Sequence, residues 1–136
     1  MASLDEFVSA QDKVYPAVRR ELSAGRKQSH WMWFIFPQLR ALGRSPTAQF
    51  YGLADAGEAQ AYLAHPVLGP RLIECTGLVN AVTGRSAHQI FGSPDDLKFR
   101  SSMTLFGRAG GGPAFAEALA KYYGGQEDSE TVRLLG

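Results

Sequence analysis

The sequence lacks several features that would assign it to a specialised class of protein. It has one cysteine, Cys75, among 136 residues, which excludes a small secreted scaffold held together by internal disulfide bonds. Two acidic residues, Asp5 and Glu6, lie where a signal peptide would carry positive charge before an apolar segment. The longest apolar run, from Trp31 to Pro37, is too short to cross a membrane as a helix. We therefore expect a cytoplasmic protein without a membrane segment.

The sequence also has little net charge and no grouping of metal-binding residues. Its 14 Lys and Arg are nearly balanced by 13 Asp and Glu, for a net charge of +1, which argues against nucleic acid as a partner. The three histidines, His30, His65 and His88, are too scattered to form a pair of metal ligands one helical turn apart. No Walker, GxSxG or dinucleotide-binding fingerprint is present. We expect no metal and no cofactor, whereas a local site for a small anion is compatible with the charge.

What the sequence does contain is enough apolar material for one packed domain. Hydrophobic residues make up 45% of the chain and aromatic residues 11%, which is typical of a globule rather than a disordered segment. A length of 136 residues is close to the commonest size of a single domain with a substantial core. We therefore treat residues 1–136 as one domain. The sequence does not specify whether the protein is a monomer or an oligomer.

Residues typical of helix ends recur along the whole chain. Ser, Asp and Pro stand where helices begin, and Gly stands where they end. Starts are expected near Ser3, Asp12, Ser29, Ser45, Asp55, Ser86, Ser93, Pro113 and Asp128, and ends near Gly25, Gly84 and Gly124. A single kinked helix is the alternative for the first two. The pattern predicts an all-α fold, an irregular bundle of seven to nine short helices without a sheet.

The run of residues 31–36 is apolar on every side, so its periodicity does not separate a buried strand from a buried helix. We favour a short helix capped by Ser29, because no partner strand is readable elsewhere and Pro37 stops the run.

One later helix has a clear inward face. Phe99, Met103 and Phe106 recur at helical spacing, so they are expected in the core. Cys75 lies in an apolar stretch without a neighbouring base, which predicts an inert buried thiol rather than a nucleophile.

Residues 25–33 form the first segment that could carry chemistry. Arg26, Lys27 and His30 precede Trp31 and Trp33 at a predicted helix start. The backbone N–H groups and the two cations could hold a phosphate while an indole stacks on a base or sugar. The structural alternative is that the aromatic residues belong to the core and the cations only meet solvent.

A second segment of interest spans residues 98–104. Lys98, Ser101 and Ser102 lie at i, i+3 and i+4 and therefore share one polar face of the predicted helix. A cation and two hydroxyls on one face could bind an anion, although a serine within a helix also bonds back to a carbonyl or allows close packing. Residues 43–46, with Arg44 and Ser45 at a helix start, are a third and generic anion site.

Three long blocks resemble the family called domain of unknown function 1810. They are GRKQSHWMWFIFPQL at 25–39, AYLAHPVLGPRL at 61–72 and IFGSPDDLKFRSSMTLF at 90–106. The resemblance covers nearly the whole chain and implies a mainly α-helical fold. It implies no activity, because the family has no established one to carry over.

A shorter pattern is similar to the carboxyl half of the NAD- and ADP-ribose-associated N-glycosidase superfamily. It consists of residues 103–106, followed by Lys121-Tyr122-Tyr123 and Leu134-Leu135. The acidic and tryptophan positions of those glycosidases have no residue-by-residue counterpart here, so the resemblance assigns no catalytic residue.

These observations favour two functions of different kinds. The first is an intracellular protein that binds or hydrolyses a small anionic metabolite, such as a nucleotide or an ADP-ribose derivative. In it His30 is the candidate catalytic group, since a histidine titrates near neutrality, unless folding brings an Asp or Glu close instead. The alternative is a non-catalytic protein-interaction module with an exposed apolar face. The two differ in whether the indoles and Lys98 border a cleft or are sealed in the core.

Overall fold

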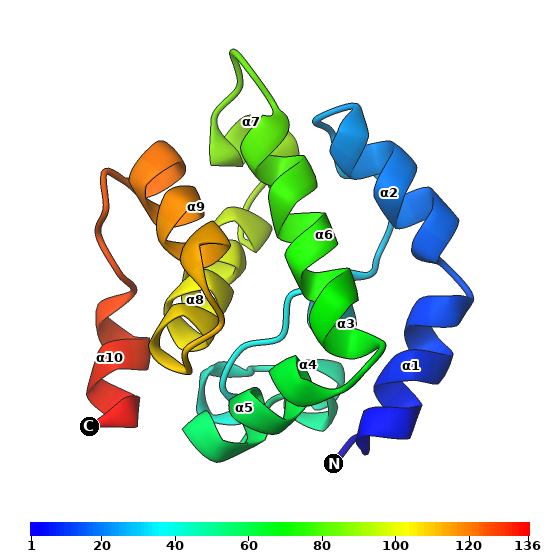
Figure 1. The fold of residues 1–136 in the computed structure, drawn as a ribbon, viewed down its shortest axis with the longest axis vertical. Coiled ribbons are helices and arrows are strands. Elements are labelled where there is room, and N and C mark those ends of the chain that lie inside the picture. Colours follow the sequence, from blue (N-terminus) through cyan, green and yellow to red (C-terminus); the bar gives the residue numbers. More distant parts are fainter.

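The protein folds almost entirely into short helices, as the computed structural model of residues 1–136 shows (Figure 1). The helices are α1 (Leu4–Asp12), α2 (Tyr15–Ser23), α3 (Met32–Ile35), the 3₁₀ helix η1 (Arg40–Leu42), α4 (Pro46–Phe50), α5 (Ala56–Ala64), α6 (Leu68–Ala81), α7 (Ala87–Phe91), α8 (Asp95–Arg108), α9 (Pro113–Tyr123) and α10 (Ser129–Leu135). The only β pairing is an isolated bridge between Leu39 and Leu53. The predicted all-α fold is confirmed. Its ten α-helices exceed the predicted seven to nine, and three of them, α3, α4 and α7, are very short.

Two helices of 14 residues, α6 and α8, organise the bundle. Helix α6 packs against α2, α5 and α9, and α8 packs against α5, α7, α9 and α10. Figure 1 shows α1 and α2 on one side of α6 and the pair α9 and α10 on the other. The amino-terminal half and the carboxyl-terminal half thus meet across α6 and α8 in a single domain. None of the helices combines the length and the apolar composition that crossing a membrane requires.

Most of the predicted helix starts are confirmed by capping side chains that accept a hydrogen bond from a backbone N–H group in the first turn. Ser3 and Ser86 each form a reciprocal capping box with the residue three positions later, Glu6 and Gln89. Single side-chain caps are made by Ser45, Asp55 and Asp128 at the starts of α4, α5 and α10. At the other end of α9, Gly124 adopts the left-handed conformation with φ +63°, which favours glycine.

Two predicted caps serve other purposes. Helix α2 starts after Val14 and is separate from α1, and the Asp12 carboxylate accepts a hydrogen bond from Arg71 at 2.7 Å. Helix α3 starts after Trp31, and the hydroxyl of Ser29 donates to the carboxylate of Glu21. In both cases a partner on another helix competes successfully for the side chain that would have capped the helix.

Two further boundaries differ by one to three residues from the prediction. Pro94 precedes the first residue of α8, so this helix begins one position later than a Ser93 cap would place it. Helix α6 ends at Ala81, and the extended residue Val82 closes it before Gly84 is reached. The carbonyl of Val82 accepts from the Lys121 ammonium at 2.5 Å. This contact from α9 gives the carbonyl a partner outside the helix.

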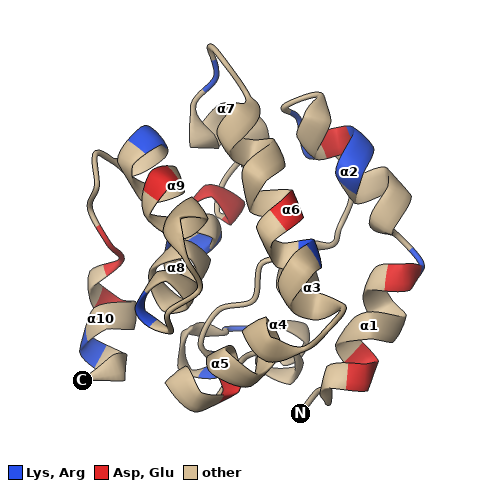
Figure 2. Ribbon diagram, viewed as in Figure 1, with Lys and Arg blue, Asp and Glu red and all other residues tan.

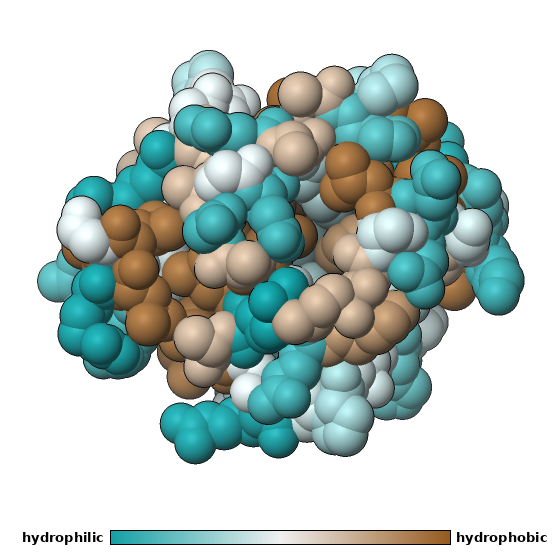
Figure 3. Space-filling view, turned by 90° about the horizontal axis from the view of Figure 1, so that it is seen from below, coloured by the Kyte–Doolittle hydropathy of each residue, from teal (hydrophilic) through white to brown (hydrophobic).

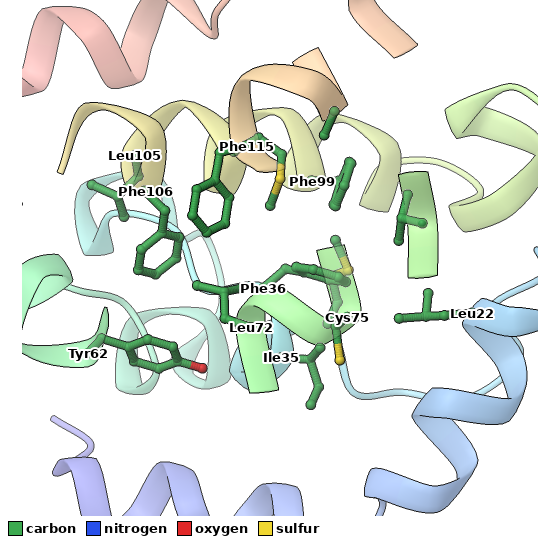
Figure 4. Close-up of a cluster of buried hydrophobic side chains, with 14 of the residues drawn as sticks. Leu22, Ile35, Phe36, Tyr62, Leu72, Cys75, Phe99, Leu105, Phe106 and Phe115 are labelled. Atoms are coloured by element: carbon green, nitrogen blue, oxygen red, sulfur yellow. The ribbon is translucent and has the colours of Figure 1, made fainter. Parts of the chain in front are cut away.

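The predicted inward face of α8 lies at the centre of the core. Phe99, Met103 and Phe106 are all completely buried. Phe36, which follows α3, meets Phe99 edge to face with ring centroids 4.9 Å apart, a favoured geometry for aromatic pairs. Figure 4 shows this cluster together with Leu72 and Cys75 from α6.

Cys75 is fully buried, and burial raises the pKa of its thiol to about 11. The thiol is therefore protonated at neutral pH. This state agrees with an inert cysteine.

Candidate functional site

The loop of residues 26–31 wraps around a buried carboxylate from α2. Glu21 is only 5% exposed, and its Oε1 accepts hydrogen bonds from the N–H groups of Gln28 at 2.7 Å and Ser29 at 2.9 Å. The indole N–H of Trp31 donates to the same oxygen at 3.0 Å, and the Ser29 hydroxyl donates to Oε2. The backbone donors that sequence reasoning offered to a phosphate are thus occupied by an internal anion.

The pKa of Glu21 reflects this enclosure. Burial alone would raise it, because a carboxylate is less stable away from water. The hydrogen bonds from Ser29, Gln28 and Trp31 outweigh burial and lower the pKa to about 2. Glu21 therefore stays ionised at neutral pH and fixes the loop by charge-assisted hydrogen bonds.

Lys27 and Trp31 are also used within the protein. The Lys27 ammonium forms an ion pair with Asp95 at 2.9 Å, and its side chain is 8% exposed. It also lies 5.1 Å from the centre of the Trp31 ring, and this indole is completely buried. Lys27 therefore ties the loop to the start of α8, and Trp31 ties it to α2 through Glu21.

Arg26 and His30 point away from this arrangement. Both are exposed, and neither lines any of the cavities of the molecule. Arg26 and His30 therefore share no cavity with Lys98. The two segments approach each other through Lys27 instead.

Asp95 is the link between the two segments. Its Oδ2 contacts Lys27 and its Oδ1 lies 3.8 Å from the ammonium of Lys98. That ammonium lies 5.9 Å from the centre of the Trp33 ring, within the range of a cation–π interaction. The Lys98 side chain is 28% exposed, against 8% for Lys27, and Trp33 is partly exposed whereas Trp31 is buried.

Lys98 stands where two cavities adjoin. The first is a narrow apolar hole lined by Met32, Trp33, Phe36, Gln38, Ala48, Tyr51 and Lys98. The second is an open cleft of about 440 Å³, lined by Gln38, Leu42, Arg44, Ser45, Ala48, Pro94, Leu97, Lys98, Ser101, Asp128 and Glu130. Gln38, Ala48 and Lys98 line both cavities. The two cavities together form the candidate site, which we call the Lys98 cleft.

The polar face predicted on α8 is divided between this cleft and the interior. Ser101 lines the cleft, and its hydroxyl donates back to the carbonyl of Leu97 at 3.2 Å. Ser102 is completely buried, does not line the cleft, and its hydroxyl has no hydrogen-bond partner. Lys98 is therefore the member of this face that offers a charge to the cleft.

The third predicted segment meets the second one here. Arg44 and Ser45 are far from Lys98 along the chain, yet all three residues line the same cleft. The Ser45 hydroxyl caps α4 by accepting from the N–H of Ala48 at 3.1 Å. The guanidinium of Arg44 forms no ion pair and no hydrogen bond within the protein. It is therefore free to meet a ligand.

Four polar residues of the lining were not identified from the sequence as site residues. Gln38 and Tyr51 carry no motif, and Glu130 lies in an ordinary first turn of α10. Asp128 was predicted as a helix cap, which it is, but nothing in its surroundings indicated that it would face Lys98. A signal for the cleft is absent because its walls come from segments far apart in the chain.

Charge is distributed over the molecule without a dominant region. Figure 2 shows residues of both charges on the same helix, for example on α2, α6, α9 and α10. Attraction of a charged ligand therefore depends on local groups such as Arg44 and Lys98 rather than on the field of the whole surface.

Comparison with known proteins agrees with the fold and adds a family. The structure is similar to the crystal structure of the conserved hypothetical protein Rv1873 from Mycobacterium tuberculosis, with 63% sequence identity and a TM-score of 0.95. The match covers 97% of this chain and 95% of that chain. No curated protein matches the sequence, and the resemblance to the N-glycosidase superfamily stays a prediction. The sequence model described as "protein of unknown function (DUF1810)" matches residues 1–135, so the chain belongs to this family.

Proposed function

We propose that this protein binds a small anionic metabolite in the Lys98 cleft. The observation that carries the proposal is that Lys98 and Arg44, from distant segments, line one cleft beside a partly exposed tryptophan. This arrangement favours ligand binding over a purely structural role of the aromatic residues. Trp33 and Lys98 border a cavity, whereas Trp31 is sealed in the core.

The size and chemistry of the cleft suit a small molecule. Its volume of about 440 Å³ falls within the range of about 300–1,000 Å³ that is usual for such sites. The ammonium of Lys98 and the guanidinium of Arg44 would bind a phosphate or a carboxylate. The guanidinium would do so through two parallel hydrogen bonds. The exposed part of the Trp33 ring would contact a flat or apolar part of the ligand. A nucleotide or an ADP-ribose derivative has both parts.

The residues of the 26–31 loop have a supporting role in this proposal. Lys27 holds the loop against the start of α8 through Asp95, and Trp31 holds it against α2 through Glu21. Asp95 also approaches Lys98, so the loop helps to position that ammonium. Arg26 and His30 are exposed and lie outside the cleft, so the proposal assigns them no contact with the ligand.

The test is a calorimetric and thermal-shift screen with nucleotides, sugar phosphates and ADP-ribose. A ligand that binds the folded state raises the melting temperature. Lys98→Met keeps the aliphatic part of the side chain and removes the charge, so it is expected to abolish the shift. Arg20→Ala is the matched control, because Arg20 is an exposed cation on α2 that lines no cavity. Equal ligand responses of both variants and the wild type would contradict the proposal.

Hydrolysis of the ligand would need a group that moves a proton. His30, the candidate from the sequence, lies outside the cleft, while the carboxylates of Asp128 and Glu130 line it. Product formation from any ligand found in the screen is therefore to be compared between the wild type and the variants Glu130→Gln and His30→Gln. Loss of turnover in Glu130→Gln alone would assign the general base to the cleft.

A protein-interaction module is the second candidate, because one face carries an apolar hollow. Figure 3, which views the molecule from below, shows hydrophobic residues gathered on the side where α10 lies. A hollow of about 280 Å³ there is lined by Leu39, Ala41, Ala54, Asp55, Ala56, Gly57, Leu134 and Leu135. Leu134 is 38% exposed. A dimer in light scattering that Leu134→Glu dissociates would favour this candidate over a free ligand-binding monomer.

The proposal includes a cytoplasmic location. Its support is the free and buried thiol of Cys75, which suits a reducing compartment. Fractionation of cells that produce the protein would test it.

A further inference from the structure

The Lys98 cleft carries groups of both charges. Arg44 and Lys98 supply positive charge, and Asp128 and Glu130 supply negative charge to the same cleft. These groups do not neutralise one another, because Lys98 pairs with Asp95 and Glu130 pairs with Arg133, outside the lining. A ligand that fills the cleft therefore meets both cations and carboxylates that are not paired with one another.

Each of the two carboxylates has one oxygen left for a ligand. The Oδ2 of Asp128 accepts from the N–H of Thr131 at 2.9 Å and from its hydroxyl at 2.6 Å, whereas Oδ1 accepts from no group of the protein. The Oε2 of Glu130 accepts from Arg133, and its Oε1 has no donor. The bonds already made hold the carboxylates in place, and the free oxygens are pure hydrogen-bond acceptors.

The acidic part of the cleft is fixed to the helix that carries Lys98. The N–H of Asp128 donates to the hydroxyl of Thr104 on α8 at 2.9 Å. The Arg100 guanidinium, also on α8, donates to the carbonyls of Gln126 at 2.9 Å and Glu127 at 3.0 Å. The position of Asp128 relative to α8 is therefore set by the fold, which lowers the cost of ordering this part of the site when a ligand binds.

We propose that the ligand of the cleft is a phosphorylated sugar, either free or as part of a nucleotide. Its phosphate lies against Lys98 and Arg44, and its hydroxyl groups donate to the free oxygens of Asp128 and Glu130. Carboxylates are used in this way to hold ribose hydroxyls in nucleotide-binding proteins. The carboxylates also disfavour ligands that place a second anionic group at this end of the cleft. This inference rests on the proposed function and specifies its ligand.

The test compares ribose 5-phosphate, ribose and inorganic phosphate by calorimetry. Ribose 5-phosphate is expected to bind about tenfold more tightly than inorganic phosphate, which is the effect of one hydrogen bond to a charged group. Ribose alone, without the anion, is expected to bind much more weakly than either.

Two conservative variants isolate the carboxylates. Asp128→Asn keeps an acceptor for the cap of α10 but replaces the free oxygen by a donor, and Glu130→Gln does the same at the second position. Each is expected to weaken ribose 5-phosphate about tenfold and to leave inorganic phosphate unchanged or slightly tighter. Glu117→Gln on α9 is the control, because Glu117 is exposed and lines no cavity.

The outcomes separate this inference from the proposed function. If inorganic phosphate and ribose 5-phosphate bind equally, and Asp128→Asn changes neither, the assignment of the carboxylates to the sugar is wrong while anion binding at Lys98 stands. If no phosphate compound binds to the wild type, both proposals are wrong. A loss of sugar preference in Asp128→Asn and Glu130→Gln with an unchanged melting temperature would support the inference.

Discussion

The loop of residues 26–31 and the Lys98 cleft contain the same kinds of side chain but use them differently. Both combine cations, a serine and a tryptophan. In the loop, Glu21 accepts four hydrogen bonds and Asp95 pairs with Lys27, so the polar groups are satisfied by the protein itself. In the cleft, Arg44 has no partner and Lys98 has a carboxylate only at 3.8 Å. The difference is that a buried carboxylate satisfies the donors of the loop at short range, whereas Arg44 in the cleft has no partner and Lys98 has only a distant one.

This comparison shows why a pattern of cations and aromatics is ambiguous. A buried polar group must be paired to avoid a free-energy cost, and the partner can come from the protein or from a ligand. Residues near the candidate segment do not reveal which of the two applies. Glu21 precedes its loop by only a few residues, yet its role depends on the loop folding back so that its donors, including the Trp31 indole, reach the carboxylate. The following experiments test the contrast between the two regions.

The largest expected effect concerns the core that supports both regions. Phe106 is completely buried on α8 and contacts Tyr62 and Phe115. Truncation to Ala is expected to lower the free energy of unfolding by about 3–5 kcal/mol, since a cavity replaces the ring. Chemical denaturation measures this change. An unchanged midpoint would mean that this face of α8 contributes little to the core. The packing of α8, which positions Lys98 in the cleft, would then be wrong.

A similar but pH-dependent effect is expected at Glu21. Its pKa is about 2 in the folded protein against a usual value of 4.5, so the ionised form contributes about 3 kcal/mol to stability. Because the folded-state pKa is the lower one, this contribution is complete above pH 4.5 and is lost as the pH falls to 2. Denaturation midpoints measured across this range should therefore fall in the wild type.

Glu21→Gln is the matched variant for that measurement. It keeps the shape of the side chain and removes its titration, so it is expected to be less stable than the wild type at pH 7 and to lose less stability on acidification. Asp5→Asn, at an exposed position in the first turn of α1, is the control. Parallel pH profiles of the wild type and Glu21→Gln would show that the loop is held by something other than this carboxylate.

A moderate effect on binding, without an effect on folding, is expected in the cleft. Arg44→Ala should weaken an anionic ligand by at least about tenfold, the usual effect of a charge-assisted hydrogen bond, and the weakening should shrink at high salt. The melting temperature should stay nearly unchanged, because Arg44 is exposed and makes no contact with a charged group of the protein. Isothermal titration at two salt concentrations measures the first effect. A stability loss with unaltered affinity would assign Arg44 to the scaffold.

The smallest effect is expected at Arg26, which sharpens the comparison from the other side. Arg26→Ala removes an exposed cation that lines no cavity, so both the melting temperature and the affinity for ribose 5-phosphate should stay close to those of the wild type. A marked loss of affinity would show that the ligand extends from the cleft to the 26–31 loop. In that case the two regions would form one site.

The sequence by itself determined the helices that local chemistry specifies. A capping side chain such as Ser3, Ser86 or Asp128 bonds to a backbone group three residues away, so the signal and its partner lie in the same short segment. The inward face of α8 was readable for the same reason, because its spacing follows from helix geometry. Where a competitor comes from elsewhere, as at Ser29 and Asp12, the same local rules placed the helix start wrongly.

Only the tertiary structure decided which polar groups are free and where they meet. The cleft joins Gln38, Arg44, Lys98 and Asp128, which belong to three separate parts of the chain, and the loop closes over Glu21 from another helix. Hydrogen bonding and burial depend on distances in space, and helical periodicity carries no information about which helices become neighbours. The sequence could therefore name Lys98 and Trp33 as candidates, but the packing of α8 against α10 and beside α4 was needed to give them a cleft.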